Sequence, residues 1–258
     1  DFPRVTCLRL LRKRKICFPF LSLISNMNQI EIVFNNQKIK GVWRDEADES
    51  VWAEIFKWRE YRVVEDIIKR DDVQIFDIGA HAGFFVLYCL ALNDKVKGVC
   101  VEPEKKNLEA LASNLKLNNN FKKVKIVPGA LALVDGDCFL KISADSHNHH
   151  ILANDENAEG VEKVVGVSLL GLVKKNKVKK IDLLKMDIEG SEFDLIESWG
   201  DEEWKIIANL IFEYHEQSGH GKEELLDILR QNGFGVQVFP SRFDKTMGII
   251  FANNKRIK

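Results

Sequence analysis

Two acidic residues, Asp77 and Glu102, lie on either side of a glycine-containing turn. Asp77 follows the apolar run 73–76 and precedes the segment 78–83, whose sequence is IGAHAG. Glu102 ends a second apolar run, 96–101. The distance from the turn to this acid is close to the roughly 20 residues of the βαβ cofactor fingerprint, in which the acid accepts hydrogen bonds from ribose hydroxyls. The spacing therefore predicts a site for an adenosine-containing cofactor.

The glycine turn differs from the one that binds dinucleotides. Dinucleotide sites use G-x-G-x-x-G, in which a helix N-terminus faces the pyrophosphate. Here the pattern is D-x-G-x-x-x-G, with Asp77 before Gly79 and with Gly83 at the end. A carboxylate would repel a pyrophosphate but would accept hydrogen bonds from an ammonium group. The pattern thus favours S-adenosylmethionine, which has an ammonium, a sulfonium and no phosphate. The alternative is that Asp77 only caps a helix and the glycines only turn the chain.

A second pair of acids follows a later apolar run. The segment 181–192, IDLLKMDIEGSE, contains Asp187 and Glu189. Ligands of an open parallel sheet bind at the carboxyl ends of its strands, so we expect these acids to face the same crevice as Asp77 and Glu102. There they could orient a substrate, bind a cation or take a proton. The alternative is that Asp187 is a helix N-cap and Glu189 a first-turn helix acid.

The histidines suggest two further sites. His215 stands just past the apolar run 206–212, at the expected rim of the crevice. A histidine can accept a hydroxyl proton near neutral pH, so His215 is a candidate general base, although an exposed loop histidine explains it equally well. The histidines of the segment 147–150 could bind zinc. No cysteine lies near them, and adjacent histidines in a polar loop more often face water, so we expect no metal.

Apolar runs with helical and extended spacing alternate through the body of the chain. This alternation predicts an α/β fold with a mostly parallel sheet and helices on both faces. The glycine turn opens a helix, and a final hairpin, 236–239 with 248–252, would add an antiparallel strand at the edge. We expect further strands at 124–127, 181–186 and 206–212, possible short strands at 131–134 and 137–142, and helices at 84–92, 105–117, 168–175, 189–199 and 222–232.

The first 26 residues differ in composition from the rest of the chain. They carry six basic residues and one acid, followed by the apolar run 16–24. This run contains a proline and two serines, is too short to span a bilayer, and lacks an A-x-A-like cleavage site. We expect residues 1–26 to lie outside the fold, with a weak peripheral membrane contact as the alternative. Residues 27–72 would form a strand and helix region that caps the cofactor site, and residues 73–258 a catalytic domain.

Composition restricts the class of protein. With 258 residues, 45% hydrophobic and 30% charged, the chain is typical of a globular protein with one main core. The five cysteines show no C-x-x-C spacing, which indicates buried thiols in a reducing compartment and favours a cytoplasmic protein. Residues 27–258 carry 32 basic and 38 acidic side chains, a net charge of −6. Nucleic acid is therefore an unfavourable partner, because its binding requires a basic stripe. The sequence carries no signal from which the oligomeric state could be predicted.

Four segments in this order, DIGAHAGFF, VEPEKKNLEALASNLKLN, KMDIEGSE and IFEYHE, resemble the FkbM-type S-adenosylmethionine-dependent methyltransferases. The K-x-D-x-E-G-x-E segment is the most specific, and the resemblance extends from about residue 73 to the final hairpin. It implies a Rossmann-like class I methyltransferase fold with a seven-stranded sheet, and methylation of hydroxyl groups, often on sugars or natural products.

The resemblance also assigns roles to residues. It places Asp77, Gly79 and Gly83 at the methionine end of the cofactor and Glu102 at the ribose, while His81 replaces the usual asparagine of the glycine loop. The matching positions of the helix 105–117 are expected to be structural; these are Asn107, Leu111 and Asn114. The expected cofactor-binding residues are Asp77, Gly79, His81, Gly83, Phe84, Glu102 and Pro103. The expected catalytic residues are Asp187, Glu189 and His215.

The expected activity is O-methylation of a small molecule or glycan. Methyl transfer is an in-line displacement, so the protein chiefly aligns the nucleophile and excludes water. The polar segment 143–160 is long and aperiodic, and is therefore a candidate lid or acceptor wall. One alternative is a methyltransferase that acts on RNA or protein; the acidic body argues against RNA. Another is a non-catalytic cofactor-binding protein, which the intact acids at 77, 102, 187 and 189 argue against.

Overall fold

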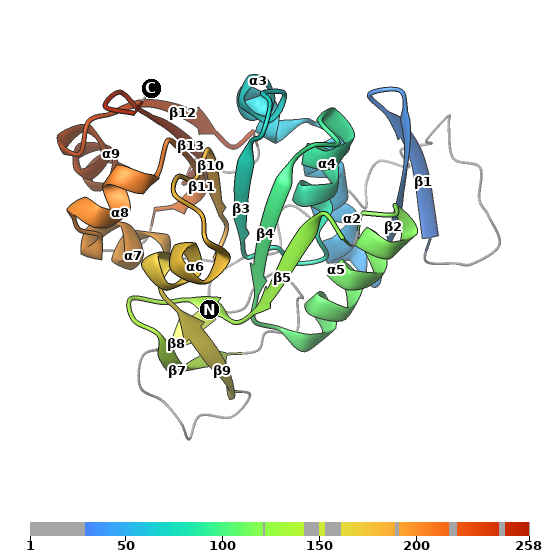
Figure 1. The fold of residues 1–258 in the computed structure, drawn as a ribbon, viewed down its shortest axis with the longest axis horizontal. Helices are drawn as coiled ribbons and strands as arrows, with labels where there is room; N and C mark the ends of the chain where they lie inside the picture. Colours follow the sequence, from blue (N-terminus) through green and yellow to red (C-terminus); the bar gives the residue numbers. More distant parts are fainter. Residues whose placement is uncertain are drawn as a thin grey trace.

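Seven strands form the central sheet of the protein (Figure 1). The computed structural model describes residues 29–120, 122–141, 150–152, 161–188, 191–216, 221–242 and 246–257. The strands are β3 (Gln74–Ile78), β4 (Lys97–Glu102), β5 (Val124–Pro128), β10 (Leu183–Met186), β11 (Asn209–His215), β12 (Phe234–Pro240) and β13 (Met247–Asn254). Their order is β12-β13-β11-β10-β3-β4-β5. The expected mostly parallel, seven-stranded α/β fold is confirmed.

The antiparallel strand lies inside the sheet and not at its edge. β13 pairs antiparallel with β11, from Asn209 opposite Asn253 to His215 opposite Met247, and it pairs antiparallel with β12 on its other side. The expectation of an antiparallel edge strand was therefore wrong in its position. The second strand of the final hairpin inserts next to the parallel strands, and the first strand, β12, becomes the edge.

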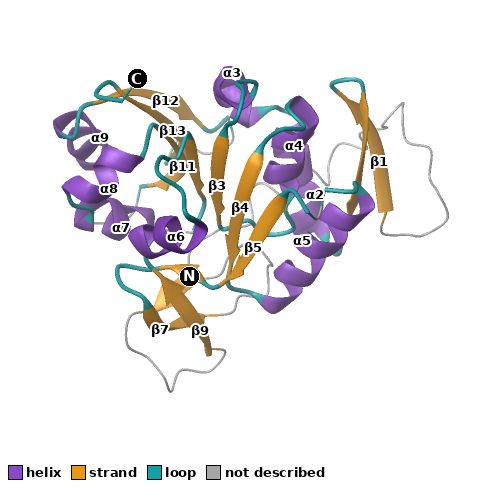
Figure 2. Cartoon of the chain, in the orientation of Figure 1, coloured by secondary structure: helices purple, strands orange, loops and turns teal. Residues whose placement is uncertain are grey.

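Helices cover both faces of the sheet (Figure 2). Side chains of each strand alternate between the two faces, so Ile75 of β3 packs on one apolar core and Phe76 on the other. The first core contains α2 (Glu46–Trp52), the π-helix η1 (Ala53–Lys57), the 3₁₀ helix η2 (Glu60–Val64), α3 (Glu65–Ile68), α4 (Phe84–Leu92) and α5 (Lys105–Leu117). The second contains α6 (Leu169–Asn176), α7 (Glu192–Ser198), α8 (Asp201–Ile206) and α9 (Lys222–Gln231). α4 is buried on almost every side because the N-terminal elements pack over it.

An N-terminal hairpin, β1 (Gln29–Phe34) with β2 (Gln37–Val42), packs beside α5. Two asparagine side chains, Asn114 of α5 and Asn118 at its C-cap, accept hydrogen bonds from backbone N–H groups of β2. Asn114 Oδ1 accepts a hydrogen bond from Val42 N at 2.8 Å, and Asn118 Oδ1 accepts one from Lys40 N at 2.9 Å. Asn114 Nδ2 also donates to the carbonyl of Ala82 in the glycine turn at 2.8 Å. The side chain of Asn114 thus joins the hairpin, α5 and the turn.

A second, smaller sheet lies beyond the carboxyl ends of the central strands (Figure 1). It contains β6 (Ala130–Leu131), β7 (Gly136–Lys141), β8 (His150–Leu152) and β9 (Val161–Val167), in the order β6-β9-β7-β8. β8 and β9 were not expected from the sequence. Most of the segment 143–160 that was expected to form a lid lies outside the described residues, namely 143–149, which includes His147 and His149, and 153–160.

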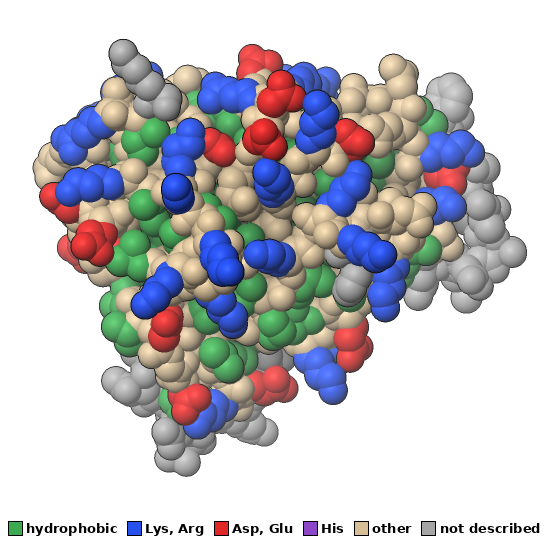
Figure 3. Space-filling view, in the orientation of Figure 1, with side chains coloured by type: hydrophobic (Ala, Val, Ile, Leu, Met, Phe, Trp, Pro, Cys, Tyr) green, Lys and Arg blue, Asp and Glu red, His purple; other side chains and the backbone are tan. Residues whose placement is uncertain are grey.

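Charged side chains of both signs cover the face seen in Figure 3. Lys and Arg side chains are spread over the middle of this face, and Asp and Glu side chains lie mostly nearer its margins. The acidic side chains therefore do not form a single negatively charged patch on this face. No helix within the described ranges is both long enough and apolar enough to cross a membrane.

Candidate active site

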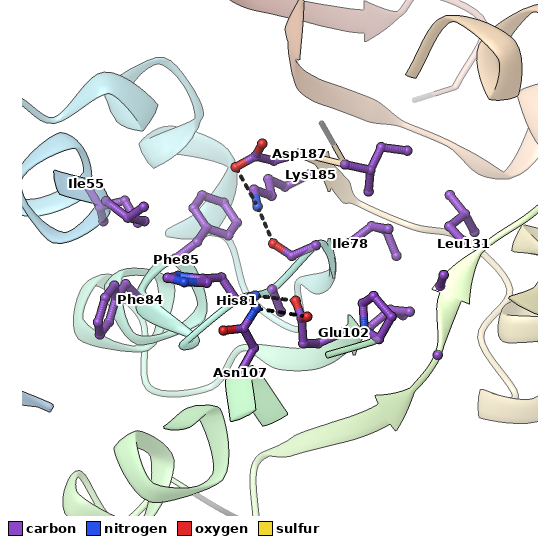
Figure 4. Close-up of a pocket in the computed structure, with 18 of the residues that line it drawn as sticks. Ile55, Ile78, His81, Phe84, Phe85, Glu102, Asn107, Leu131, Lys185 and Asp187 are labelled. Atoms are coloured by element: carbon purple, nitrogen blue, oxygen red, sulfur yellow. Dashed lines mark hydrogen bonds and ion pairs between the residues drawn. The ribbon is translucent and has the colours of Figure 1, made fainter. Parts of the chain in front are cut away.

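A cavity opens at the carboxyl ends of β3, β4 and β10 (Figure 4). The strand order changes direction between β3 and β10, and this is where ligands bind in open parallel sheets. One wall comes from the glycine turn and α4, a second from the end of β4, and a third from η1 and η2. The expected site residues that line the cavity are Gly79, His81, Phe84, Glu102, Pro103 and Asp187.

The two glycines of the turn are required by protein contacts. Gly79 has a φ of +69°, and a Cβ at this position would lie 1.8 Å from the carbonyl oxygen of Asp187. Gly83 has a φ of +79°, and its Cβ would lie 2.2 Å from Leu111 Cδ1 of α5. Both positions combine a left-handed backbone with a close neighbour, which only glycine tolerates. Gly83 therefore acts in the packing of α5 against the turn, and Gly79 in bringing the turn close to the end of β10.

The carboxylate of Glu102 is positioned by three donors. Its Oε2 accepts a hydrogen bond from His81 N at 2.8 Å, and its Oε1 accepts one from Asn107 Nδ2 at 3.2 Å (Figure 4). Glu102 Oε1 also accepts a hydrogen bond from Glu104 N at 2.9 Å. Burial raises the pKa of Glu102 to about 7, against the opposite effect of these hydrogen bonds. A carboxylate has about four acceptor positions, so Oε2 retains capacity for a ligand hydroxyl.

Lys185 joins the glycine turn to the end of β10, a role that we did not predict. Its Nζ lies 3.3 Å from Asp77 Oδ1 and 3.5 Å from Asp187 Oδ2, and donates to the carbonyl of Gly79 at 3.0 Å. Burial alone would lower the pKa of Lys185, but the two carboxylates outweigh it and raise the pKa above its ordinary value. Asp77 is 1% exposed and lies beneath the cavity lining. The sequence signal that could have indicated this role was a lysine inside an apolar run. In the structure, Lys185 lies opposite Asp77 in the parallel register of β10 and β3.

His81 connects the glycine turn to the N-terminal elements. Its backbone is left-handed, with φ +50°, and its Nε2 lies 3.0 Å from Arg44 Nη2 and 3.2 Å from Asp48 Oδ1. Arg44 donates to both oxygens of the buried Asp48 at 2.8 Å. The histidine of this loop therefore contacts an ion pair that comes from the elements preceding β3.

The expected catalytic residues are not all at the cavity. Asp187 lines it, with a side chain that is 27% exposed. His215 ends β11 opposite Met247, and the described residues that line the cavity do not include it. Glu189 lies outside the described residues. The roles of these three residues therefore stay predictions.

The sequence led us to expect that residues 27–72 cap the cofactor site, but it named no residue of η1 or η2. These two elements contribute Glu54, Ile55 and Tyr61 to the cavity lining. Glu54 is half-buried, and its Oε1 accepts a hydrogen bond from Ser50 Oγ at 3.0 Å. No motif marks this segment, and a π-helical turn has no sequence pattern by which it could have been expected.

The charges of the lining fit a cationic ligand. Three acidic residues, Glu54, Glu102 and Asp187, line the cavity, and among the described residues Lys185 is the one Lys or Arg that lines it. Its charge is already matched by the adjacent carboxylates, so a pyrophosphate would find no free cation. Apolar side chains such as Phe84 supply a surface for a purine. The lining therefore fits S-adenosylmethionine. Within the described ranges, no three His, Cys, Asp or Glu residues could together hold a metal ion.

Comparison with known proteins identifies the same class. The profile of the methyltransferase FkbM domain matches residues 77–236. Methyltransferase sdnD of Sordaria araneosa is 25% identical over 191 residues, which cover 63% of this chain and 73% of that protein. Methyltransferase 1 of Beauveria bassiana is 25% identical over 188 residues, covering 65% and 74%. A methyltransferase FkbM structure from Methylobacillus flagellatus KT shares the fold with a TM-score of 0.51 at 14% identity, covering 77% of this chain and 47% of that one.

Proposed function

Since the chain belongs to the FkbM methyltransferase family, whose methyl donor is S-adenosylmethionine, we propose that it methylates a hydroxyl group on a sugar, a glycan or a small natural product. The observation that carries this proposal is the excess of carboxylates around the cavity. An uncharged hydroxyl acceptor can enter this environment, whereas a phosphate-bearing acceptor would be repelled. The predicted preference for a small molecule or glycan over RNA rests on the same property.

Some residues of the cavity would bind the cofactor, and others would contact the acceptor. Glu102 would accept hydrogen bonds from the ribose, because its Oε2 retains acceptor capacity. Asp187 is held by Lys185 at the end of β10 and would contact both the ammonium of the cofactor and the acceptor. S-adenosylmethionine, when bound, supplies an electrophilic methyl group. Apolar neighbours such as Phe84 and Ile188 would limit the access of water to the reacting groups.

Calorimetry and a methyl-transfer assay test this function. Binding of S-adenosylmethionine is measured first, and transfer of a labelled methyl group is then assayed with hydroxyl-bearing glycans and natural products, with their phosphorylated forms, and with RNA and protein. We expect transfer to a neutral hydroxyl acceptor and loss of that transfer in Asp187→Asn. Transfer only to RNA or protein would overturn the proposed acceptor class. Cofactor binding without transfer to any acceptor would favour a non-catalytic protein.

A further inference from the structure

We propose that Glu54 is the general base of the methyl transfer and takes the proton of the acceptor hydroxyl. This inference rests on the proposed O-methylation. Glu54 lies outside the segment 77–236 that matches the family, and none of the sequence motifs includes it. Glu54 lines the same cavity as Asp187, and the charge of Asp187 acts on its carboxylate.

The local structure places Glu54 at the cavity wall. It belongs to the π-helix η1, a rare geometry that is frequently found at functional sites. The neighbouring Ile55 and Phe56 are buried and anchor this turn to the core, and Figure 4 shows Ile55 on the cavity wall. Ser50 Oγ holds Glu54 Oε1 at 3.0 Å. No donor to Oε2 is found among the described residues, so this oxygen can accept a proton from a ligand.

The electrostatic environment suits proton transfer near neutral pH. Burial raises the pKa of Glu54 to about 7, and the charges of Glu60 and Asp187 add to this effect, while the hydrogen bond from Ser50 opposes it. Glu60 and Tyr61 face Glu54 from η2, and Asp187 faces it from the end of β10. A general base is most effective when its pKa is close to the working pH.

The proposed step conserves atoms and charge. The acceptor oxygen forms a bond to the methyl carbon while the bond between that carbon and sulfur breaks, and the electron pair of the broken bond stays on sulfur. The hydroxyl proton passes to Oε2 of Glu54. The products are the methyl ether, S-adenosylhomocysteine and a neutral carboxylic acid, which releases its proton to solvent before the next turnover.

Two other groups are less suited to this role. Asp187 Oδ2 lies 3.5 Å from the Lys185 ammonium and is therefore already engaged in an ion pair. His215, the base expected from the sequence, is absent from the described lining of the cavity. Glu54, in contrast, lines the cavity, and no cation from the described part of the chain is among the groups that shift its pKa.

An acceptor-independent measurement tests where Glu54 lies relative to the methyl group. Sinefungin is a cofactor analogue in which a carbon bearing an amino group replaces the sulfur and its methyl. If Glu54 faces the methyl position, Glu54→Gln removes a charge that attracts this ammonium. We expect calorimetry to show sinefungin binding weakened about tenfold and S-adenosylhomocysteine binding unchanged. Glu49→Gln makes the same charge change at an exposed position of α2 and should alter neither.

Kinetics with a hydroxyl acceptor test the chemical role. Glu54→Gln should lower kcat by about 10²–10⁴-fold with cofactor affinity retained, whereas His215→Ala should lower it by less than about tenfold. The rate of the wild type should rise with pH through about 7, since Glu54 must be ionised to accept the proton. Ser50→Ala removes a hydrogen bond that favours the ionised form, so it should shift this rise to higher pH.

Distinct results separate the failure of each proposal. Equal effects of Glu54→Gln on sinefungin and S-adenosylhomocysteine, or no effect on either, would overturn the role of Glu54. So would a Glu54→Gln variant with normal kcat, or a large loss confined to His215→Ala. If no hydroxyl acceptor is methylated, the proposed function is overturned instead. The sinefungin comparison still tests the position of Glu54 in that case, because it requires no acceptor.

Discussion

At the scale of single residues, Glu102 is the part of the site whose geometry is most complete before a ligand binds. Three protein donors fix its carboxylate, so little conformational freedom remains to be lost when a ribose is bound. Glu102→Ala leaves the ribose hydroxyls without their charged acceptor. We expect S-adenosylhomocysteine affinity to fall by about 2–3 kcal/mol in calorimetry.

The control for this prediction is Glu109→Ala, which removes an exposed carboxylate from α5. It should leave affinity unchanged. A Glu102→Ala variant that binds within a factor of two of the wild type would contradict the assignment of the ribose site. Binding of NAD in place of S-adenosylhomocysteine would contradict the interpretation of the glycine turn.

Lys185 permits a second prediction, on stability. Lys185→Met leaves Asp77 as a buried carboxylate without its cation, which typically costs about 3–5 kcal/mol. Denaturant unfolding should show this loss, and adding Asp77→Asn to Lys185→Met should restore part of it because the uncompensated charge is removed. Lys180→Met breaks an ion pair of a half-exposed lysine with Asp182 and should cost less than about 1 kcal/mol. Equal losses from Lys180→Met and Lys185→Met would contradict this account.

The residues of the site were predictable where a local pattern carries the geometry. Glu102 and Gly79 were found because an acid and a glycine at the ends of adjacent strands have a known spacing. Lys185 was missed because its partner Asp77 is 108 positions away in the sequence and is paired through the strand register. Glu54 was missed because its position depends on how η1 packs over α4. Both omissions arise from tertiary contacts that the sequence pattern does not encode.

At the scale of elements, α5 supports the glycine turn as well as the sheet. Asn114 satisfies Val42 N in β2 and the carbonyl of Ala82 in the turn. Asn114→Leu would leave both backbone groups buried without these partners, at an expected cost of about 2–3 kcal/mol. Denaturant unfolding measures this cost, and hydrogen exchange should show faster exchange of the Val42 amide.

Lys116→Leu is the matched control, because it introduces the same side chain at an exposed position of α5. It should change the free energy of unfolding by less than about 0.5 kcal/mol. Unaltered exchange at Val42 in Asn114→Leu would contradict the role of Asn114 as the partner of β2.

The elements were predictable in proportion to their length and burial. α4 and α5 begin and end where the sequence predicted, because a buried apolar run and an amphipathic run are each bounded by turn residues. β9 was missed, since its exposed and half-exposed side chains break the expected alternation. α8 was missed because six residues give too short a periodic signal. The position of β13 depends on which strand of the hairpin pairs with β11, and no local pattern decides this.

At the scale of the whole molecule, the cavity combines two parts of the chain. Residues 77–236 match the family, whereas η1 and η2 complete the wall from before that segment. The ion pair of Arg44 with Asp48 contacts His81 and so joins these two parts beside the cofactor turn. The cavity and the glycine turn therefore both depend on the elements between residues 29 and 68.

Residues 1–26 are expected to contribute nothing to this arrangement. The described cavity lining falls between Val51 and Ile188, and the first described element begins at Gln29. A shortened chain that begins at Met27 should therefore show the same melting temperature, within about 1–2 °C, and the same S-adenosylhomocysteine affinity. A melting temperature lower by several degrees would show that this segment packs on the fold. Co-sedimentation with anionic vesicles by the full chain, but not by the shortened one, would instead assign the basic and apolar segment to a membrane surface.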